Sequence, residues 1–208
     1  MRIARRAALL CSAVALLLSL GTSGASADAL KQGGAAVAAG FNLNLTSNSI
    51  VITGAFANPV TCTGSGIATT VTSNNVAGVP ARADLDNWTF AGCTLPGGAA
   101  CAVFVNALPW GNAVWLRNGP PKTFSISFPA NRLLSVACGG MVCSYVGAAA
   151  VPPASVTGAW TDSPSTTTPA TVQFVNAPLA HVAGGCPVAG AIFTGTYRTT
   201  TNAMTLTV

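Results

Sequence analysis

The stretch WTFAGCTLPGGAACAVFVNALPWGNAVW (88–115) decides the fold. It holds three of the chain's four tryptophans and two of its cysteines. The turn sequences LPGG (95–98) and PWG (109–111) separate short runs in which apolar and polar residues alternate. Alternation with a period of two is typical of strands that bury one face. We therefore predict three consecutive antiparallel strands here, at the centre of a disulfide-bonded β domain.

The same alternation recurs on both sides of this stretch. Examples are the runs at 41–46, 49–56, 122–128, 132–138, 142–146 and 191–198. Gly139 and Gly140 stand between two of these runs and favour a hairpin turn. No segment shows helical periodicity. The sequence therefore predicts an all-β, antiparallel β-sandwich of the Ig-like kind, in a single domain over 41–208. A barrel-like variant and two small packed β units are the alternatives.

The N-terminus has the three parts of an export signal. Arg2, Arg5 and Arg6 precede an uncharged apolar run (7–20), and ASA (25–27) is a small-residue cleavage site. This pattern predicts a signal peptide over 1–27 and a secreted or cell-surface protein. The apolar run is shorter than the roughly 20 residues that span a bilayer, so we expect no transmembrane helix in the mature chain. The small, Gly-rich residues at 28–40 predict a flexible lead-in to the domain.

Cysteine usage indicates disulfides. The mature chain has six cysteines, and an even number in an exported protein indicates three bridges. Zinc coordination is disfavoured, because no CxxC occurs and His181 is the only histidine.

Six cysteines allow 15 pairings. We favour bridging Cys143 with Cys186, because both follow turns and flank the C-terminal strands. Cys62 with Cys93 comes next, which leaves Cys101 with Cys138. Local closure from Cys138 to Cys143 and from Cys93 to Cys101 is the competing arrangement.

The mature chain carries little charge. Loss of the signal peptide leaves six basic and four acidic side chains, a net charge of +2. The basic residues are scattered and form no patch, so we expect no nucleic-acid binding. Ser and Thr supply most of the polar surface, which suggests contact with a cell-wall polymer, a lipid or another protein.

Groups that could do chemistry are few. The chain has no Glu, four Asp and one His. Asp84 and Asp86 are the only close carboxylate pair, and the glycine and further oxygen ligands of a calcium loop are missing. A Ser–His–Asp triad could use only His181, and no G-x-S-x-G sequence is present. We predict no catalytic residue, metal or cofactor, with a secreted hydrolase that uses His181 as an alternative.

Aromatic side chains are the remaining binding candidates, because their rings stack on sugars and apolar ligands. Trp110 lies in the PWG turn and is the best candidate for an exposed aromatic residue. Trp160 and Tyr145 join it as speculative ligand-binding residues. Trp88 and Trp115 lie on alternating strands, so we expect both in the core.

Three short motifs resemble small exported β-proteins of actinobacteria: GCT at 92–94, LPW at 108–110, and GCP with GTY between 185 and 197. The resemblance spans most of the mature chain and implies export and an all-β fold. The function of those proteins is uncharacterised, so it implies no catalytic residues.

We therefore expect a secreted, non-enzymatic binding or structural protein of the bacterial cell envelope or extracellular space. A membrane-associated β assembly is a further alternative, and it requires an apolar face turned toward lipid.

Overall fold

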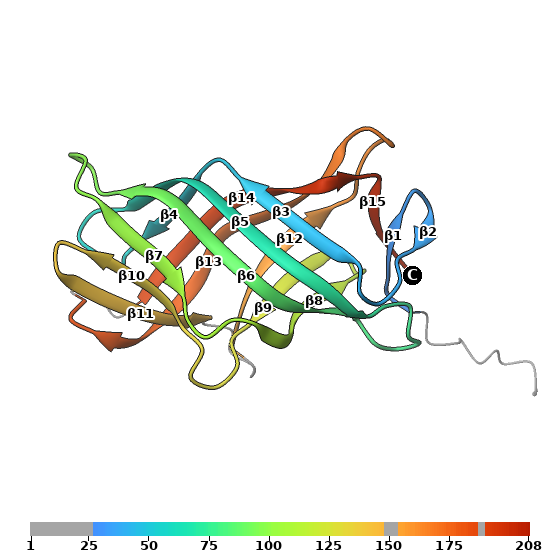
Figure 1. The fold of residues 1–208 in the computed structure, drawn as a ribbon, viewed down its shortest axis with the longest axis horizontal. Helices are drawn as coiled ribbons and strands as arrows, with labels where there is room; N and C mark the ends of the chain where they lie inside the picture. Colours follow the sequence, from blue (N-terminus) through green and yellow to red (C-terminus); the bar gives the residue numbers. More distant parts are fainter. Residues whose placement is uncertain (1–26, 148–153, 187–189) are drawn as a thin grey trace, which may run out of the picture.

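The computed structural model describes residues 27–147, 154–186 and 190–208, and shows an all-β chain (Figure 1). The strands, in order, are β1 (Ala29–Gln32), β2 (Ala35–Ala36), β3 (Asn42–Ser47), β4 (Ile50–Thr53), β5 (Val60–Ser73), β6 (Ala81–Thr94), β7 (Cys101–Val105), β8 (Trp110–Arg117), β9 (Thr123–Ser127), β10 (Leu134–Cys138), β11 (Met141–Gly147), β12 (Ser155–Thr161), β13 (Pro169–Gly184), β14 (Gly190–Asn202) and β15 (Met204–Thr207). Within these ranges there is no helix with the length and apolar character needed to cross a membrane. The predicted signal peptide falls on residues outside the described ranges, apart from Ala27, and stays a prediction.

Eight strand positions close into an antiparallel barrel. The strands around the barrel are, in order, β5, β6, β8, β9, β12, β13 and β14. The short strands β3 and β4 share the eighth position, between β14 and β5. Both of these short strands pair with β14 on one side and with β5 on the other. The all-β prediction is confirmed, in its barrel-like variant. The Ig-like sandwich that we placed first is not observed, because β3 and β4 join the two edges that a sandwich leaves open.

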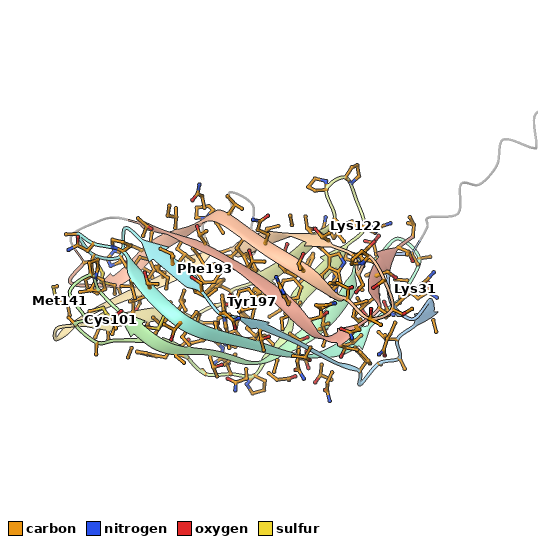
Figure 2. The ribbon with its side chains drawn as sticks, turned by 90° about the horizontal axis from the view of Figure 1, so that it is seen from above. Lys31, Cys101, Lys122, Met141, Phe193 and Tyr197 are labelled. Atoms are coloured by element: carbon orange, nitrogen blue, oxygen red, sulfur yellow. A yellow bond between two sulfur atoms is a disulfide. The ribbon has the colours of Figure 1, made fainter. Side chains whose placement is uncertain are left out.

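The two ends of this elongated barrel differ (Figures 1 and 2). At one end, β1 pairs with β2 and β15 in a small separate sheet, and Leu30 and Leu206 are fully buried there. We call it the terminal-strand end. At the opposite end, β11, β10 and β7 extend the wall beyond β13. Figure 2 shows Lys31 and Lys122 at the terminal-strand end, and Cys101 and Met141 at the other.

Residues 28–40 are not the flexible lead-in that their composition predicted. They include β1, which pairs with β15 over four residues. The backbone N–H of Leu30 donates to Asn74 Oδ1 at 2.7 Å, and Asn74 Nδ2 donates back to the Leu30 carbonyl at 2.9 Å. The domain therefore begins before residue 41, because the last strand offers this segment an edge that the sequence did not reveal.

The three strands predicted within 88–115 all form, but β7 does not form a ladder with either of the other two. β6 pairs directly with β8, and Arg82 lies opposite Trp115. β7 packs beside β6 and is linked to it by a single bridge between Thr94 and Ala100, but its ladder of hydrogen bonds is formed with β10. The prediction of consecutive pairing is therefore wrong for β7, which forms its ladder with a strand from later in the chain.

Three disulfides link Cys62 to Cys93, Cys101 to Cys138 and Cys143 to Cys186. They are the pairs that the sequence analysis favoured over local closure. The first joins β5 to β6, the second joins β7 to β10, and the third ties β11 to the segment after β13. The bridged cysteines are 31 to 43 residues apart, so each bridge restricts the unfolded chain, an effect typically worth about 2–4 kcal/mol.

Large apolar side chains fill the barrel. Phe124, Phe174 and Phe193 are fully buried. The Phe174 ring centroid lies 5.4 Å from that of Phe193 and 6.4 Å from that of Phe124, both in edge-to-face geometry. An eight-stranded barrel has an interior that side chains can just fill. These three rings therefore occupy the barrel interior as part of its packed core.

One chain of hydrogen bonds crosses this core. Trp88 Nε1 donates to the Tyr197 hydroxyl at 3.1 Å, and Ser65 Oγ lies 2.7 Å from the same hydroxyl. Ser65 Oγ in turn donates to the Thr89 carbonyl at 2.7 Å, so Tyr197 must donate to Ser65. Burial raises the pKa of the Tyr197 hydroxyl, and the bonds to Ser65 and Trp88 offset this only in part. The phenol is therefore a neutral donor that joins β5, β6 and β14.

Replacing Tyr197 with Phe should test this chain. The substitution leaves Trp88 Nε1 without an acceptor and deprives Ser65 Oγ of a donor, so the free energy of unfolding should fall by about 1–3 kcal/mol. Urea unfolding followed by circular dichroism measures it. Tyr145→Phe is the matched control, because the Tyr145 hydroxyl reaches only Cys186 Sγ, at 3.6 Å, and its loss should cost less. Equal losses in the two variants would contradict the role given to the Tyr197 hydroxyl.

Candidate functional site

The aromatic residues predicted to bind ligand are structural. Trp110, Trp160 and Tyr145 are only 1%, 4% and 0% exposed. Trp110 is the first residue of β8 rather than part of an exposed turn, and its ring centroid lies 5.2 Å from that of Phe128. Its Nε1 donates to the Asn106 carbonyl at 2.9 Å. The prediction of an exposed stacking surface at these residues is therefore wrong.

Trp115, which we placed in the core, lies on the outer face of the barrel. Its neighbours Val114 and Leu116 are fully buried, and Trp115 itself is half-buried. Trp88 is buried as predicted. The sequence misassigned Trp110 and Trp115, because Ala113 and Val114 are both buried and alternation in β8 is interrupted there.

His181 lies on β13 and packs against Tyr145, with 5.7 Å between the ring centroids. Within the described residues its Nε2 is buried and makes no hydrogen bond. Three of the aspartates have structural partners elsewhere: Asn112 N donates to Asp84 and Thr70 Oγ1 to Asp86, and Asp162 lies in the network described next. The structure does not bring a serine, His181 and an aspartate together in a triad within the described residues.

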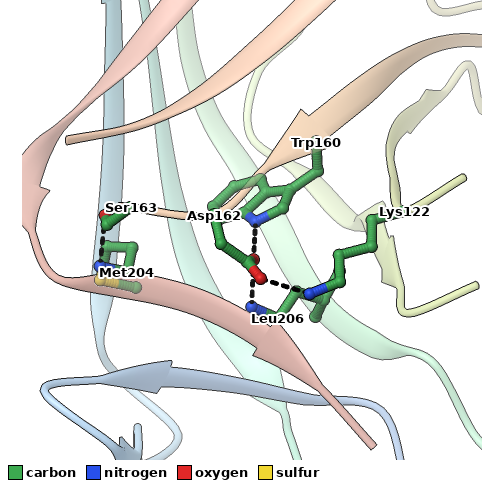
Figure 3. A network of polar contacts seen from close by, with 6 residues as sticks. All are labelled: Lys122, Trp160, Asp162, Ser163, Met204 and Leu206. Carbon is green, nitrogen blue, oxygen red and sulfur yellow. Dashed lines mark hydrogen bonds and ion pairs between the residues drawn. The ribbon is translucent and has the colours of Figure 1, made fainter. Parts of the chain in front are cut away.

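Asp162 organises the terminal-strand end (Figure 3). Its Oδ1 accepts hydrogen bonds of 2.8 Å from Trp160 Nε1 and from the backbone N–H of Leu206, and its Oδ2 pairs with Lys122 Nζ. Burial alone would raise the pKa of the Asp162 carboxyl, but these hydrogen bonds and the charge of Lys122 outweigh burial and lower it. The ionised carboxylate therefore joins β12, β15 and the loop before β9.

A groove of about 460 Å³ runs over the outer face of β14, framed by two β-bulges. On one side, Thr46 lies opposite Arg198 and Ile50 opposite Gly195, so the β3–β4 segment has one residue more than β14. Ser47 Oγ holds this bulge, since it donates to the Ser49 carbonyl and accepts from the Ser49 N–H.

The second bulge lies on the other side of β14. The register of β13 shifts between Phe174 and Ala177, where Asn176 has a left-handed backbone with φ of 50°. The backbone N–H of Asn176 donates to Thr194 Oγ1 at 3.2 Å. Bulges re-aim side chains and are frequent next to functional sites. Here they leave Thr194, Thr196 and Arg198 as the floor of the groove.

The groove is lined mainly by hydroxyl and amide groups. Around its floor residues stand Thr46, Ser47, Asn48, Ser49, Val51 and Gln173. Most of these side chains are exposed, and Arg198 supplies the one positive charge. Such a lining can donate and accept many neutral hydrogen bonds, which suits a polyhydroxylated ligand. A groove of this size falls within the range of known ligand sites.

The sequence analysis missed this groove, although the sequence contains a signal for it. The buried side chains are at odd-numbered positions at Leu43 and Leu45 and at even-numbered positions at Ile50 and Ile52. This shift by one residue marks one bulge. The buried positions shift again between Phe174 and Ala177, which marks the other. Only the pairing order places both bulges on the two sides of the same strand.

Comparison with known proteins adds no further candidate: no protein family, curated protein or solved structure matches the chain. The resemblance to exported actinobacterial proteins therefore stays a prediction.

Acid should weaken the Asp162 network. A carboxyl whose pKa is lowered by folding stabilises the fold above its unfolded pKa of about 3.9, and this stabilisation is lost as the pH falls through the folded value. At about pH 6 the urea midpoint of the wild type should therefore be higher than that of Asp162→Asn. The difference between the two midpoints, which we call the gap, should narrow below about pH 4.

The control is Asp86→Asn, which removes one carboxylate that is exposed and accepts from Thr70 Oγ1 alone. It should produce a smaller gap than Asp162→Asn at about pH 6. An Asp162→Asn gap that stays constant down to about pH 3 would show that the ionised carboxylate does not stabilise the terminal-strand end.

Proposed function

We propose that the mature chain is an exported, non-enzymatic binding protein that attaches to a hydroxyl-rich polymer of the cell envelope or extracellular space. The groove over β14 is the observation that carries this proposal. It is open along the barrel wall and presents hydroxyl, amide and guanidinium groups to one side. An open groove accommodates the middle of a polymer, whereas an enclosed cavity accepts only a small molecule or a chain end.

The outer surface of the barrel supports a polymer ligand over a lipid. Outward positions on neighbouring strands carry hydroxyls, among them Thr89, Thr157, Thr196 and Thr200, all of which are exposed. A membrane-associated β assembly, our third hypothesis, needs an outward apolar face instead. The observed outer face matches a hydrogen-bonding surface better.

The placement of the titratable groups supports a non-enzymatic role. His181 packs beside Tyr145, and Asp84, Asp86 and Asp162 accept hydrogen bonds that hold the fold. A hydrolase would need a base or carboxylate presented to the ligand. The groove has none among its lining residues.

Export has two lines of support. The first is the signal-peptide pattern at 1–27. The second is the set of three disulfides, which hints at an oxidising, extracellular environment.

The groove can be tested with the double variant Gln173→Ala, Thr196→Val. Each substitution removes side-chain hydrogen-bonding groups from the groove without adding bulk. If each lost hydrogen bond contributes about 1 kcal/mol, the double variant should bind at least about tenfold more weakly. Cosedimentation of the mature protein with an actinobacterial wall preparation, and with the uncharged polymers cellulose and chitin, measures the binding.

Thr61→Val is the matched control, because it removes an exposed hydroxyl from β5, outside the groove. It should bind like the wild type. Equal binding by the wild type and the double variant would remove the groove from the site. Release of soluble sugars during the incubation would instead favour the hydrolase.

A further inference from the structure

A second cluster of side chains lies on the outer wall, on β6 and β8. Arg82 on β6 stands directly opposite Trp115 on β8, and Arg117 follows two residues along the same strand. The Cζ atoms of Arg82 and Arg117 lie 4.5 Å and 5.4 Å from the centroid of the Trp115 ring. Trp115 Nε1 donates to the Asn112 carbonyl at 3.1 Å, which fixes the ring. Two guanidinium groups therefore converge on one immobilised indole.

Neither arginine forms an ion pair with a carboxylate within the described ranges, where the pair between Lys122 and Asp162 is the one observed. Asp84 lies on the same strand as Arg82, and it accepts a 2.6 Å hydrogen bond from the Asn112 N–H instead. Arg82 Nε is buried and makes no hydrogen bond in the part of the chain that the structure describes. A buried donor without an acceptor costs free energy, and two guanidinium groups beside the same ring repel each other where neither is paired with a carboxylate.

A bound anion would remove both costs at once. It would accept hydrogen bonds from the two guanidinium groups and compensate their charge. Hydroxyl donors lie beside the cluster on β9, where Ser125 stands opposite Trp115 and Thr123 opposite Arg117.

We propose that Arg82, Trp115 and Arg117 form a binding site for a phosphate group carried by an anionic polymer. A carboxylate has two oxygens and suits one guanidinium fork, whereas a phosphate presents oxygens to donors on more than one side. This site is separate from the groove over β14. In the closed barrel β8 and β14 are four positions apart in either direction, so the two sites lie on opposite sides.

The surroundings of the cluster favour a polymer over a membrane surface. Large apolar side chains that are exposed in the described residues belong to other strands and loops, and none lies on β6, β8 or β9. A protein that rests on a lipid surface usually inserts apolar side chains beside its basic ones. Phosphate on a water-soluble chain therefore fits this hydroxyl-bordered face.

Fluorescence titration of the mature protein with inorganic phosphate and with polyphosphate tests the site, because Trp115 is the half-buried tryptophan and Trp88, Trp110 and Trp160 are buried. We expect a fluorescence change with both probes, tighter binding of the chain, and loss of the change in Trp115→Phe. Arg117→Gln should weaken polyphosphate binding by about tenfold or more. Arg117→Lys should recover only part of this loss, since Lys keeps the charge but not the fork.

Arg132→Gln is the matched control, because it removes the same charge from the loop between β9 and β10, outside both the cluster and the groove. It should bind polyphosphate like the wild type. If Arg117→Gln also binds like the wild type, the site is wrong. Because Arg117 is exposed, its replacement should leave the urea midpoint unchanged, so a loss of binding is not a loss of folding.

Vesicles of phosphatidylcholine with and without phosphatidylglycerol separate the two sources of phosphate. We expect no cosedimentation of the protein with either. Binding that requires phosphatidylglycerol and Arg117, without polyphosphate binding, would overturn the polymer assignment in favour of a membrane surface. Cellulose binding by Arg117→Gln is a separate readout, so failure at this site and failure of the groove can be told apart.

Discussion

Closure of the barrel by residues 42–53 is the constraint on which the rest of the structure depends. The two short strands β3 and β4 fill the one position between β14 and β5, so that the eight-stranded wall has no open edge. Their inward side chains Leu43, Leu45, Ile50 and Ile52 are all buried. Apolar side chains can point inward on both β3 and β4 only if the segment between the two strands has one extra residue. That residue forms the bulge at 47–49. The outer groove is therefore a geometric consequence of closing the core.

In the described part of this weakly charged chain, hydrogen bonds hold most of the polar groups, and the Lys122–Asp162 ion pair adds to them at the terminal-strand end. The path from Trp88 through Tyr197 to Ser65 satisfies the polar groups in the middle of the barrel. Asn74 plays a similar part at the terminal-strand end, where its side chain bonds both the N–H and the carbonyl of Leu30. Burying a polar group costs little free energy only when its hydrogen-bond partners are in place. Each of these networks therefore favours one arrangement of strands. Disulfides add further restraint at the opposite end of the barrel.

Both sites that we propose lie on the outer wall of the barrel. On one side the wall presents hydroxyl and amide groups over β14, and on the other it presents two guanidinium groups around Trp115. These chemistries differ, since the first suits neutral hydroxyls and the second suits an oxyanion. A polymer that carries both sugars and phosphates would offer ligands to both sides, without any chemistry inside the barrel. The two surfaces are thus compatible with the binding role that we propose.

The sequence by itself determined the all-β character, which side chains of most strands face the core, and the presence of three disulfides. These features follow from local alternation and from composition. The tertiary structure alone decided that the edges close, that residues 29–32 pair with the last strand, and that β7 forms its ladder with β10 rather than with β6. It also reversed the expected positions of Trp110 and Trp115, since an interrupted alternation in β8 changes which side chain faces the core. Pairing between distant strands is set by which edges remain free, and no local pattern records that.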